Sequence, residues 1–416
     1  MWNDGMPDAS QNMATPDADP AAMPACGQCG RTNDSLMRCS LCLEVFYCNR
    51  ECQVVAWKQG HKKACRRAAP ASSPSGTMKP SRTGAAFDGI EYTHPFVRDS
   101  TRFYEQITAT HCADLMDQGF TIIDNFLGNE WSHALLTELQ FLVKKELLEP
   151  NKTQFPSTTT PGAVAQYAKP HIFEADLHNA AVRTQVPELN ALFHQDDLLL
   201  ALAQHTNLPL QPGTQGKTLK VQFNEGHGGC FPCHYDNPGR PNKRRLTCLL
   251  YLNPSWTNGD GGEIQFYPFL TTPVVVAPRM DRLVVFSSDR VLHRVLPARA
   301  PRYCLTVWID GHDVNTDEHA ALNVTASDLE HWDGFVAKLA ASPVQRLLSR
   351  GVYAEEYLES LTQCMADDAP DGFRDMLHSH NAHLARVKAN APLQSLVDKL
   401  RDHKFANASS TATIVL

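Results

Sequence analysis

The chain has 416 residues, of which 43% are hydrophobic and 20% charged, and its formal net charge is -7. This is the composition of a globular protein with a sizeable core, and the length allows two or three domains. The negative charge disfavours nonspecific binding to nucleic acid or to an anionic membrane, so we expect neither as a partner. The start of the chain is polar and lacks a signal peptide, and no run approaches the ~18 apolar residues of a membrane span. We therefore expect a cytoplasmic protein, with the nucleus as a second compartment.

Shifts in composition predict five regions. Residues 1–24 are rich in Ala, Asp and Pro and are typical of a disordered tail. Residues 26–65 hold seven of the 13 cysteines. Residues 66–98 are rich in Ser, Pro and Ala, which indicates a flexible linker. We expect a folded domain over residues 100–312 and a helical C-terminal region over residues 313–405.

The main domain is predicted to be rich in short strands. The run GFTIIDNFL (119–127) is an apolar strand that ends in a polar turn, and residues 131–149 carry leucines at helical spacing. Within a core at 216–311, β-branched or aromatic runs alternate with Gly, Pro, Asn and Asp. Many short strands at this spacing predict an antiparallel sandwich or barrel. The runs are LKVQF, LTCLLYL, EIQFYPF, PVVVAP, RLVVFSS and YCLTVWI.

The C-terminal region shows helix boundaries. Ser327 and Glu330 fit a capping box. The Ser-Pro pair at 342–343 can open a helix that Gly351 can close. The tail after Ala406 is expected to be frayed.

Residues 26–65 combine eight soft metal ligands in four closely spaced pairs. Zinc takes four N or S ligands in a tetrahedral array, so eight ligands fit two closed structural sites. A segment of ~40 residues cannot bury enough apolar area to fold alone, so metal binding would supply its folding free energy. In a chain without a secretion signal, dense cysteines indicate metal binding rather than disulfides. The pairs are Cys26/Cys29, Cys39/Cys42, Cys48/Cys52 and His61/Cys65.

The run FYCNRECQVVAWKQGHKKAC resembles the second half of the MYND zinc finger, and the resemblance covers residues 26–65. One departure is Ala56, where the family often has histidine, but this position is not a ligand. The resemblance implies a module that binds protein partners, often through short proline-containing peptides. It also implies two interleaved zinc sites, one formed by Cys26, Cys29, Cys48 and Cys52, the other by Cys39, Cys42, His61 and Cys65.

A second metal site is predicted in the strand-rich core. His234 and Asp236 are two residues apart on an extended segment, so their side chains project to the same side. His293, which follows a predicted strand, completes a set of two histidines and one carboxylate. Such a facial triad leaves open positions on Fe(II) for a cosubstrate and for dioxygen.

A candidate anion site accompanies this metal site. Arg302 starts the strand after His293, and Thr306 and Trp308 alternate onto the same face of that strand. A guanidinium there can bind the distal carboxylate of 2-oxoglutarate in a bidentate way. Beside the ligand set, this indicates an oxygenase that uses iron(II) and 2-oxoglutarate.

These stretches resemble the prolyl hydroxylases that act on hypoxia-inducible factor, the oxygen-sensor family. The similarity runs from about Gly119 to Gly311, and an N-terminal MYND finger is also the arrangement of the family's animal members. The matching stretches are HYDNP (234–238), RRLTCLLYLN (244–253), GGEIQFYP (261–268), DRLVVFSSDR (281–290) and RYCLTVW (302–308).

The resemblance implies a double-stranded β-helix with supporting helices. With the small zinc finger and the helical C-terminal extension, which is longer than the family leads us to expect, this predicts a mixed α+β protein. The resemblance also implies Fe(II), 2-oxoglutarate, O2 and ascorbate as cofactors or cosubstrates, and a prolyl residue of a protein as substrate, in a peptidyl-prolyl 4-hydroxylase linked to the hypoxia response. Its residues would be iron ligands at His234, Asp236 and His293, contacts to 2-oxoglutarate from Arg302 and Tyr251, and contacts to the substrate from Arg244 and Trp308.

Several positions depart from the family or have no assigned role. Asn224 stands where the animal enzymes have a tyrosine in the cofactor pocket, and Ser287 replaces a tryptophan, which puts cofactor affinity and oxygen response in doubt. Cys230 and Cys233 form a C-x-x-C that could act as a redox switch. We expect instead two loop cysteines without a role, and packing roles for the scattered Cys112, Cys248, Cys304 and Cys364.

Three alternative functions fit the sequence less well. Nucleic-acid dealkylases resemble a pattern with arginines six and twelve residues after the distal histidine, where this chain has Arg299 and then Leu305. Collagen-type prolyl hydroxylases use a lysine ten residues after it, where this chain has Tyr303, and they are secretory. The last is a scaffold that recruits partners through the finger beside an inert β-domain, which the intact ligand set and Arg302 disfavour.

Overall fold

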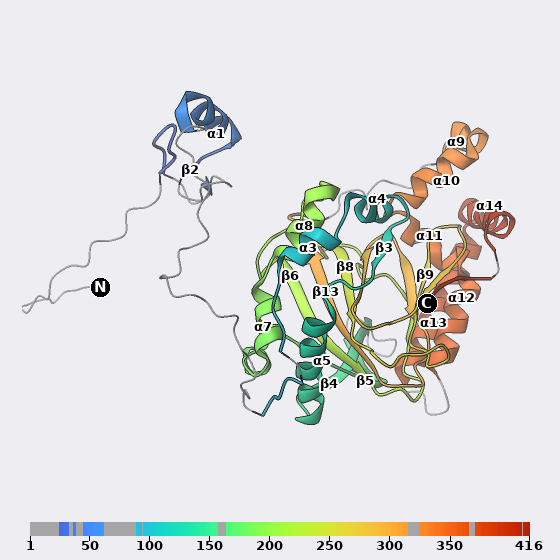
Figure 1. Ribbon diagram of the computed structural model, residues 1–416. Helices are drawn as coiled ribbons and strands as arrows, with labels where there is room; N and C mark the ends of the chain where they lie inside the picture. The colour runs from blue at the N-terminus through green and yellow to red at the C-terminus, as the bar shows by residue number, and fades with distance from the viewer. Residues whose placement is uncertain are drawn as a thin grey trace, which may run out of the picture. The chain divides into compact units, whose positions relative to one another are not determined.

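The computed structural model describes residues 25–32, 36–38, 45–61, 89–93, 95–156, 164–314, 324–365, 371–409 and 411–416. The chain divides into two compact units, residues 1–79 and 80–416 (Figure 1). The predicted tail and residues 66–88 of the predicted linker lie outside the described residues.

The first unit contains a small antiparallel ribbon and one helical segment. Strands β1 (Met37–Arg38) and β2 (Phe46–Tyr47) pair with each other, and helix α1 (Arg50–Ala56) runs into a π-helical turn, η1 (Trp57–His61). Its buried apolar cluster comprises Cys26, Tyr47 and Ala56, with a few partly buried neighbours. So small a core is typical of domains that a bound metal stabilises.

The second unit is built on two facing sheets. The larger sheet has the strand order β3-β11-β8-β13-β6-β5-β4, and all its pairings are antiparallel. Its strands are β3 (Phe120–Ile123), β4 (Glu149–Pro156), β5 (Val164–Asp176), β6 (Lys217–Asn224), β8 (Arg244–Tyr251), β11 (Arg282–Ser287) and β13 (Arg302–Asp310).

The smaller sheet has the order β14-β10-β9-β12-β7 and contains one parallel pair, β10 with β14. Together with the helices that cover both sheets, it confirms the predicted mixed α+β fold with a double-stranded β-helix as its core. The strands of this sheet are β7 (Phe231–His234), β9 (Ile264–Tyr267), β10 (Val274–Val276), β12 (Leu292–Val295) and β14 (Thr413–Val415).

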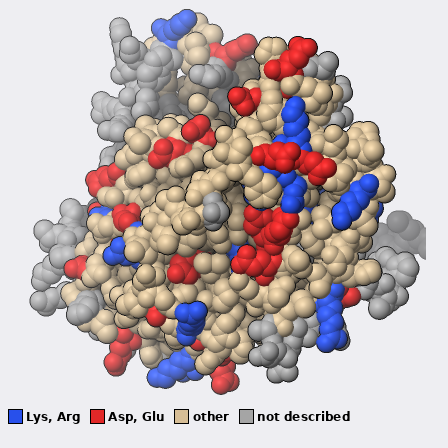
Figure 2. All heavy atoms as spheres, turned by 90° about the vertical axis from the view of Figure 1, so that its right-hand side faces the viewer, with Lys and Arg blue, Asp and Glu red and all other residues tan. Residues whose placement is uncertain are grey.

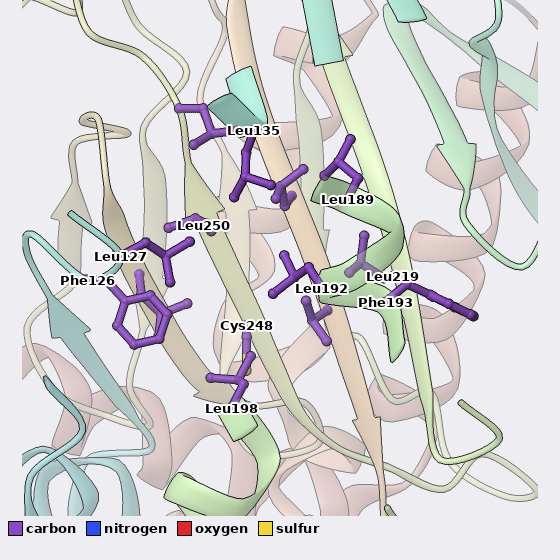
Figure 3. Packing of buried hydrophobic residues seen from close by; sticks show 14 of the residues in the cluster. Phe126, Leu127, Leu135, Leu189, Leu192, Phe193, Leu198, Leu219, Cys248 and Leu250 are labelled. Carbon is purple, nitrogen blue, oxygen red and sulfur yellow. The ribbon is translucent and has the colours of Figure 1, made fainter. Parts of the chain in front are cut away.

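The period of two along each strand separates the two faces of the larger sheet. In β8, Cys248 and Leu250 face a helix-covered core, whereas Leu249 and Tyr251 belong to a cluster between the sheets. Figure 3 shows side chains of the early helices meeting those of β6 and β8. These helices are α3 (Thr101–Gln106), α4 (Ala109–Asp117), α5 (Asn129–Lys144), α6 (Ala180–Arg183), α7 (Pro187–His194) and α8 (Asp197–Thr206).

The C-terminal helices cover the face of the smaller sheet that points away from the larger sheet (Figure 1). One apolar cluster joins Tyr267 and Leu292 of that sheet to Leu348, Tyr353 and other side chains of the helices. On this face acidic and basic side chains are interspersed (Figure 2). The helices are α9 (Ala326–Glu330), α10 (Trp332–Ala340), α11 (Gln345–Val352), α12 (Ala354–Cys364), α13 (Asp371–Ala389) and α14 (Ala391–Asn407).

Some predicted boundaries were wrong. The helix predicted for residues 131–149 ends at Lys144, and Glu149 already begins β4. The capping box of α9 uses Thr325 and Asp328, rather than Ser327 and Glu330. Both errors are local, because leucine spacing and short polar residues do not by themselves locate the turn that ends or begins a helix.

Two expectations for the end of the chain were also wrong. Gly351 lies inside α11 rather than after it, and a Cβ there would approach Val397 of α14 to 3.0 Å. The tail that was expected to fray forms β14, and Arg282 donates hydrogen bonds to the carbonyls of Val415 and Leu416. Partners distant in sequence determine both features.

The cysteines near the core differ from the expectation as well. Cys230 forms a disulfide with Cys364 across a separation of 134 residues, although both were expected to have no pairing. Cys233 is free and buried, and burial raises the pKa of its thiol to about 12. The reactive thiolate is thereby disfavoured, and Cys230 is bonded to Cys364 rather than to Cys233.

Within the parts of the chain that the structure describes, no helix has both the length and the apolarity needed to cross a membrane.

The disulfide should contribute measurably to stability. Replacing Cys364 with serine is expected to lower the free energy of unfolding of the oxidised protein by about 2–4 kcal/mol, because the bond restricts the unfolded chain. Denaturant unfolding followed by tryptophan fluorescence would measure the difference. Reductant should bring wild type to the stability of the variant and leave the variant unchanged; equal stabilities of the two oxidised proteins would contradict the link.

Candidate active site

A cavity of about 500 Å³ opens between the two sheets. Strands β4 to β9 and β11 to β13 all contribute to its walls. Its apolar side is formed by Leu249, Ile264, Phe286 and Val295. The predicted metal ligands and Arg302 all line this one cavity.

His234, Asp236 and His293 come together at the wall formed by the smaller sheet. His234 ends β7, and the antiparallel register with β12 places His293 directly opposite it. Asp236 Oδ1 lies 3.4 Å from Nε2 of His234 and 3.9 Å from Nε2 of His293. The ligand atoms of the three residues all lie within 4.8 Å of one another, which suits one metal ion.

The backbone orients both imidazoles in the same way. Nδ1 of His234 donates to the carbonyl of Pro232 (2.8 Å), and Nδ1 of His293 donates to that of Val291 (3.1 Å). Because a carbonyl only accepts, the proton of each neutral ring sits on Nδ1, and Nε2 keeps its lone pair for a metal. Burial lowers the pKa of His293 to about 4, so this ring is neutral at physiological pH.

The carboxylate of Asp236 is held at one oxygen and open at the other. Oδ2 accepts hydrogen bonds from Thr247 Oγ1 (2.6 Å) and Trp308 Nε1 (3.1 Å). Burial by itself raises the pKa of Asp236. The two histidines and the Thr247 hydroxyl have a larger, opposite effect and hold that pKa well below its usual range. The group is therefore an anion whose Oδ1 faces the two imidazoles.

Arg302 lies deeper in the cavity, with only 3% of its surface exposed. Its Nε donates to the carbonyl of Gly262 (2.8 Å), and Nη1 contacts Gln222 Oε1 at 3.5 Å. Among the described residues it has no carboxylate partner within 4.0 Å. A buried guanidinium without a counterion is costly, so this end of the cavity suits an anionic ligand.

The predicted cofactor contact Tyr251 adjoins Arg302, although it is not among the residues that line the cavity. Its ring lies 4.9 Å from the Arg302 guanidinium, and its buried hydroxyl has no hydrogen-bond partner within the described structure. An orphaned donor beside a guanidinium fits one end of a dicarboxylate, whose other end would reach the metal ligands. The donor set, two imidazoles and one carboxylate, fits Fe(II).

The two predicted substrate contacts touch each other at the mouth. The guanidinium of Arg244 lies 3.9 Å from the ring centroid of Trp308, and its Nη1 donates to the backbone carbonyl of Asp236 (3.1 Å). Trp308 thus also holds the carboxylate of the candidate metal ligand Asp236, a contact that its place in the sequence did not reveal.

Sequence reasoning missed other residues of the site. Thr247 holds the carboxylate of Asp236. It was not predicted, even though the alternation of β8 places its side chain on the inward face. The β4–β5 hairpin contributes Asn151 and Lys169, whose side chains are 2.6 Å apart. Burial lowers the pKa of Lys169 to about 8. No local motif marked this hairpin.

The positions that depart from the family lie outside the cavity lining. Asn224 is fully buried, donates to the carbonyl of Gly229 (2.9 Å) and accepts from the backbone of Gly226 (3.0 Å), so it holds the turn after β6. The hydroxyl of Ser287 donates to Asp289 at 3.0 Å. Asn224 is nevertheless the register partner of Arg302 in the pairing of β6 with β13.

The finger unit brings together one of the two predicted ligand sets. The sulfur atoms of Cys26, Cys29, Cys48 and Cys52 all lie within 4.8 Å of one another, which suits one tetrahedral ion. In the second set, His61 ends η1. The other three members, Cys39, Cys42 and Cys65, lie outside the described residues.

The hydrogen bond from Thr247 should matter for metal affinity. Thr247→Val is expected to weaken binding of Mn(II) by roughly ten- to a hundredfold, because it frees Oδ2 of Asp236 to rotate. Titration of protein that carries zinc only in its finger, with free Mn(II) followed by EPR, measures the main site, since Mn(II) competes poorly for thiolates. Thr218→Val, on β6 outside the cavity lining, is the control; equal affinities of the two variants would contradict this role.

Comparison with known families agrees with this geometry. A family model of the 2OG-Fe(II) oxygenase superfamily matches residues 219–310, the segment that holds the three candidate ligands and Arg302. A model of the MYND finger matches residues 26–65, the segment of the cysteine pairs.

Individual relatives point the same way. A solved prolyl 4-hydroxylase structure from Phytophthora capsici is 49% identical, covers 77% of this chain and all of its own, and superposes with a TM-score of 0.68. The hypoxia-inducible factor prolyl hydroxylase of Caenorhabditis elegans is 27% identical over 198 residues, 47% of this chain and 27% of that protein. Egl nine homolog 1 of Homo sapiens is 37% identical over 102 residues, 24% of this chain and 23% of that protein. This chain therefore spans about a quarter of the length of these curated relatives. It belongs to the 2OG-Fe(II) oxygenase superfamily, within its prolyl 4-hydroxylases, and it carries a MYND finger.

Proposed function

We propose that this chain is an iron(II)- and 2-oxoglutarate-dependent dioxygenase that hydroxylates prolyl residues of a protein substrate. The observation that carries the proposal is the placement, in one cavity, of two imidazole Nε2 atoms and one carboxylate oxygen beside a buried arginine that has no acidic partner among the described residues. Metal ligands without an anion site would suit many metalloproteins, whereas the combination suits a metal and a dicarboxylate bound together.

Each residue has a separate task in this proposal. His234, Asp236 and His293 hold Fe(II), while Arg302 and Tyr251 bind the distal carboxylate of 2-oxoglutarate. The bound iron and keto acid supply the oxidising power for C–H hydroxylation. The apolar walls at Leu249 and Phe286 exclude water from the metal side of the cavity. No protein acid or base is required.

The protein substrate would enter at the mouth, past Arg244 and Trp308. Their stacked arrangement offers an apolar ring for a proline and a cation for the peptide backbone or an acidic neighbour. Relatives named for hypoxia-inducible factor motivate a role in oxygen sensing, which we propose for this chain together with ascorbate as a reductant and a cytoplasmic or nuclear location.

The other oxygenase classes fit the cavity less well. Leu305, at the place of the dealkylases' second arginine, is part of the helix-covered core. Tyr303, at the place of the collagen-type lysine, stacks on Phe223 at 5.0 Å and is absent from the cavity lining. On β13, the residues that line the cavity are Arg302, Thr306 and Trp308, and Arg302 is the cation that this strand contributes.

Succinate formation from 2-oxoglutarate, with Fe(II) and proline-containing peptides, tests the proposal. We expect His234→Ala to abolish turnover. Arg302→Ala should raise the KM for 2-oxoglutarate by roughly ten- to a hundredfold, because it removes charge-assisted hydrogen bonds, and high keto acid should partly restore turnover.

Arg299→Ala is the matched control, since Arg299 is an exposed arginine close in sequence to Arg302. Its KM should remain that of wild type. The proposal fails if wild type forms no succinate with any prolyl peptide, or if Arg302→Ala behaves like Arg299→Ala.

For the finger, we propose two zinc ions, one on Cys26, Cys29, Cys48 and Cys52, and one on Cys39, Cys42, His61 and Cys65, in a module that binds protein partners. Zinc would supply most of the folding free energy of so small a unit. The close approach of the first four sulfur atoms supports the first site, with 3.5 Å between Cys29 and Cys48 and 3.3 Å between Cys48 and Cys52.

Cys26→Ser tests the first zinc site. The variant is expected to lose at least half of the tightly bound zinc, measured by elemental analysis, because a closed site needs all four ligands. Gln28→Ala, in the same turn, should keep the zinc content of wild type. Because residues 1–79 form a separate unit, succinate formation on short peptides should persist in both variants. Unchanged zinc in Cys26→Ser would exclude this ligand set.

A further inference from the structure

The strand that carries His234 and leads to Asp236 has little support from its own sheet. β7 is four residues long and lies at the end of the strand order, where its only neighbour among the described strands is β12. Its register with β12 shifts between the His234 pair and the Phe231 pair. Asp236 follows the end of the strand. A ligand pair on so short an edge strand needs support from another element to keep a fixed geometry.

That support comes from the C-terminal helices α11 and α12. The residues that alternate with the ligands make contacts to these helices. The backbone N–H of Cys233 donates to Ser360 Oγ of α12 (3.0 Å), and the Tyr235 hydroxyl lies 2.5 Å from Ser349 Oγ of α11. Arg346 of α11 donates to the backbone carbonyl of Asn237 (2.5 Å). Every second residue from 233 to 237 is thus tied to a helix.

The opposite ligand strand is held by the same helix. Arg294, next to His293 on β12, is 1% exposed and lies 3.4 Å from Glu359 Oε1 of α12, and it also donates to Gln363. The disulfide from Cys230 to Cys364 joins the start of β7 to the end of α12. Both ligand strands therefore have α12 as a common support.

The two serines that meet β7 are buried and fully engaged. Ser349 and Ser360 have no exposed surface. Ser349 donates to the carbonyl of Gln345 (2.9 Å) and so accepts from Tyr235, while Ser360 donates to Tyr357 (2.8 Å) and accepts from Cys233. Each hydroxyl accepts a hydrogen bond from β7 or from the segment after it and donates one to the backbone of a helix. It thereby fixes the distance between that segment and the helix.

We infer that α11 and α12 are a positioning device for the metal centre, and that Ser349 and Ser360 are positioning residues acting through Tyr235 and Cys233. This inference rests on the proposed metal site. The C-terminal helical region thereby acquires a role in the oxygenase unit itself. Removing either hydroxyl leaves the three ligands in place but loosens the segment that sets their mutual distances.

The test is the Mn(II) affinity of protein that carries zinc only in its finger, measured by EPR without any turnover. Ser349→Ala and Tyr235→Phe are each expected to weaken Mn(II) binding roughly three- to tenfold. Because they break the same hydrogen bond, the double variant should bind about as well as the weaker single variant. Ser360→Ala should show a similar loss and should broaden the EPR signal of the bound ion.

Thr362→Ala is the matched control on α12, because its hydroxyl donates only within the helix, to Leu358 (2.8 Å). It should bind Mn(II) like wild type. Thermal unfolding of the metal-free proteins separates positioning from stability. If the serine variants lose stability yet keep wild-type Mn(II) affinity and signal, the helices merely stabilise the fold and the inference is overturned. His234→Ala should abolish binding; if it does not, the metal site is wrong, and the inference falls with it.

Discussion

The site is organised around the buried carboxylate of Asp236. A carboxylate taken out of water is costly unless hydrogen bonds and positive charge surround it. Here Thr247 and Trp308 satisfy one oxygen, and the other faces the Nε2 atoms of His234 and His293. A cation between these three groups would balance the remaining negative charge of the carboxylate. The larger sheet supplies the hydrogen-bond donors and the smaller sheet the imidazoles, so the packing of the two sheets brings the site together.

At the inner end of the cavity the buried charge is positive, so the group that would balance it is an anion. Within the described part of the chain, Arg302 is buried without an acidic partner, and Tyr251 places beside it a ring face and a hydroxyl that has no hydrogen-bond partner there. One cavity therefore holds a place for a cation and a place for an anion. A ligand that chelates the metal and carries a second carboxylate satisfies both, which is the chemical description of 2-oxoglutarate. Neither place would be filled well by a neutral ligand.

The helices after the β-core contribute to the geometry of the same site. An edge strand of four residues cannot by itself hold ligands to the tolerance that a metal centre needs. The side chains of α11 and α12 meet the residues between the ligands, and their apolar faces share a cluster with Tyr267 and Leu292. The helices thus occupy the side of β7 that no strand covers among the described residues. The finger, by contrast, forms a separate unit with its own small cluster.

Several features of this protein's fold and candidate site could be predicted from short-range patterns in the sequence. His-x-Asp and the strand alternation from Arg302 to Trp308 depend only on the period of two, so ligand types and the inward face of β13 followed from the sequence. The cysteine pairs likewise indicated a metal-binding segment. Tertiary structure alone decided the contacts between distant residues: Trp308 on Asp236, Cys230 with Cys364, and Ser349 on Tyr235. It also decided that the chain's end pairs with β10 and that Gly351 lets α11 approach α14. Local pattern records which face a side chain takes, whereas the partner on that face is set by how sheets and helices pack, because packing joins segments whose separation in sequence carries no signal.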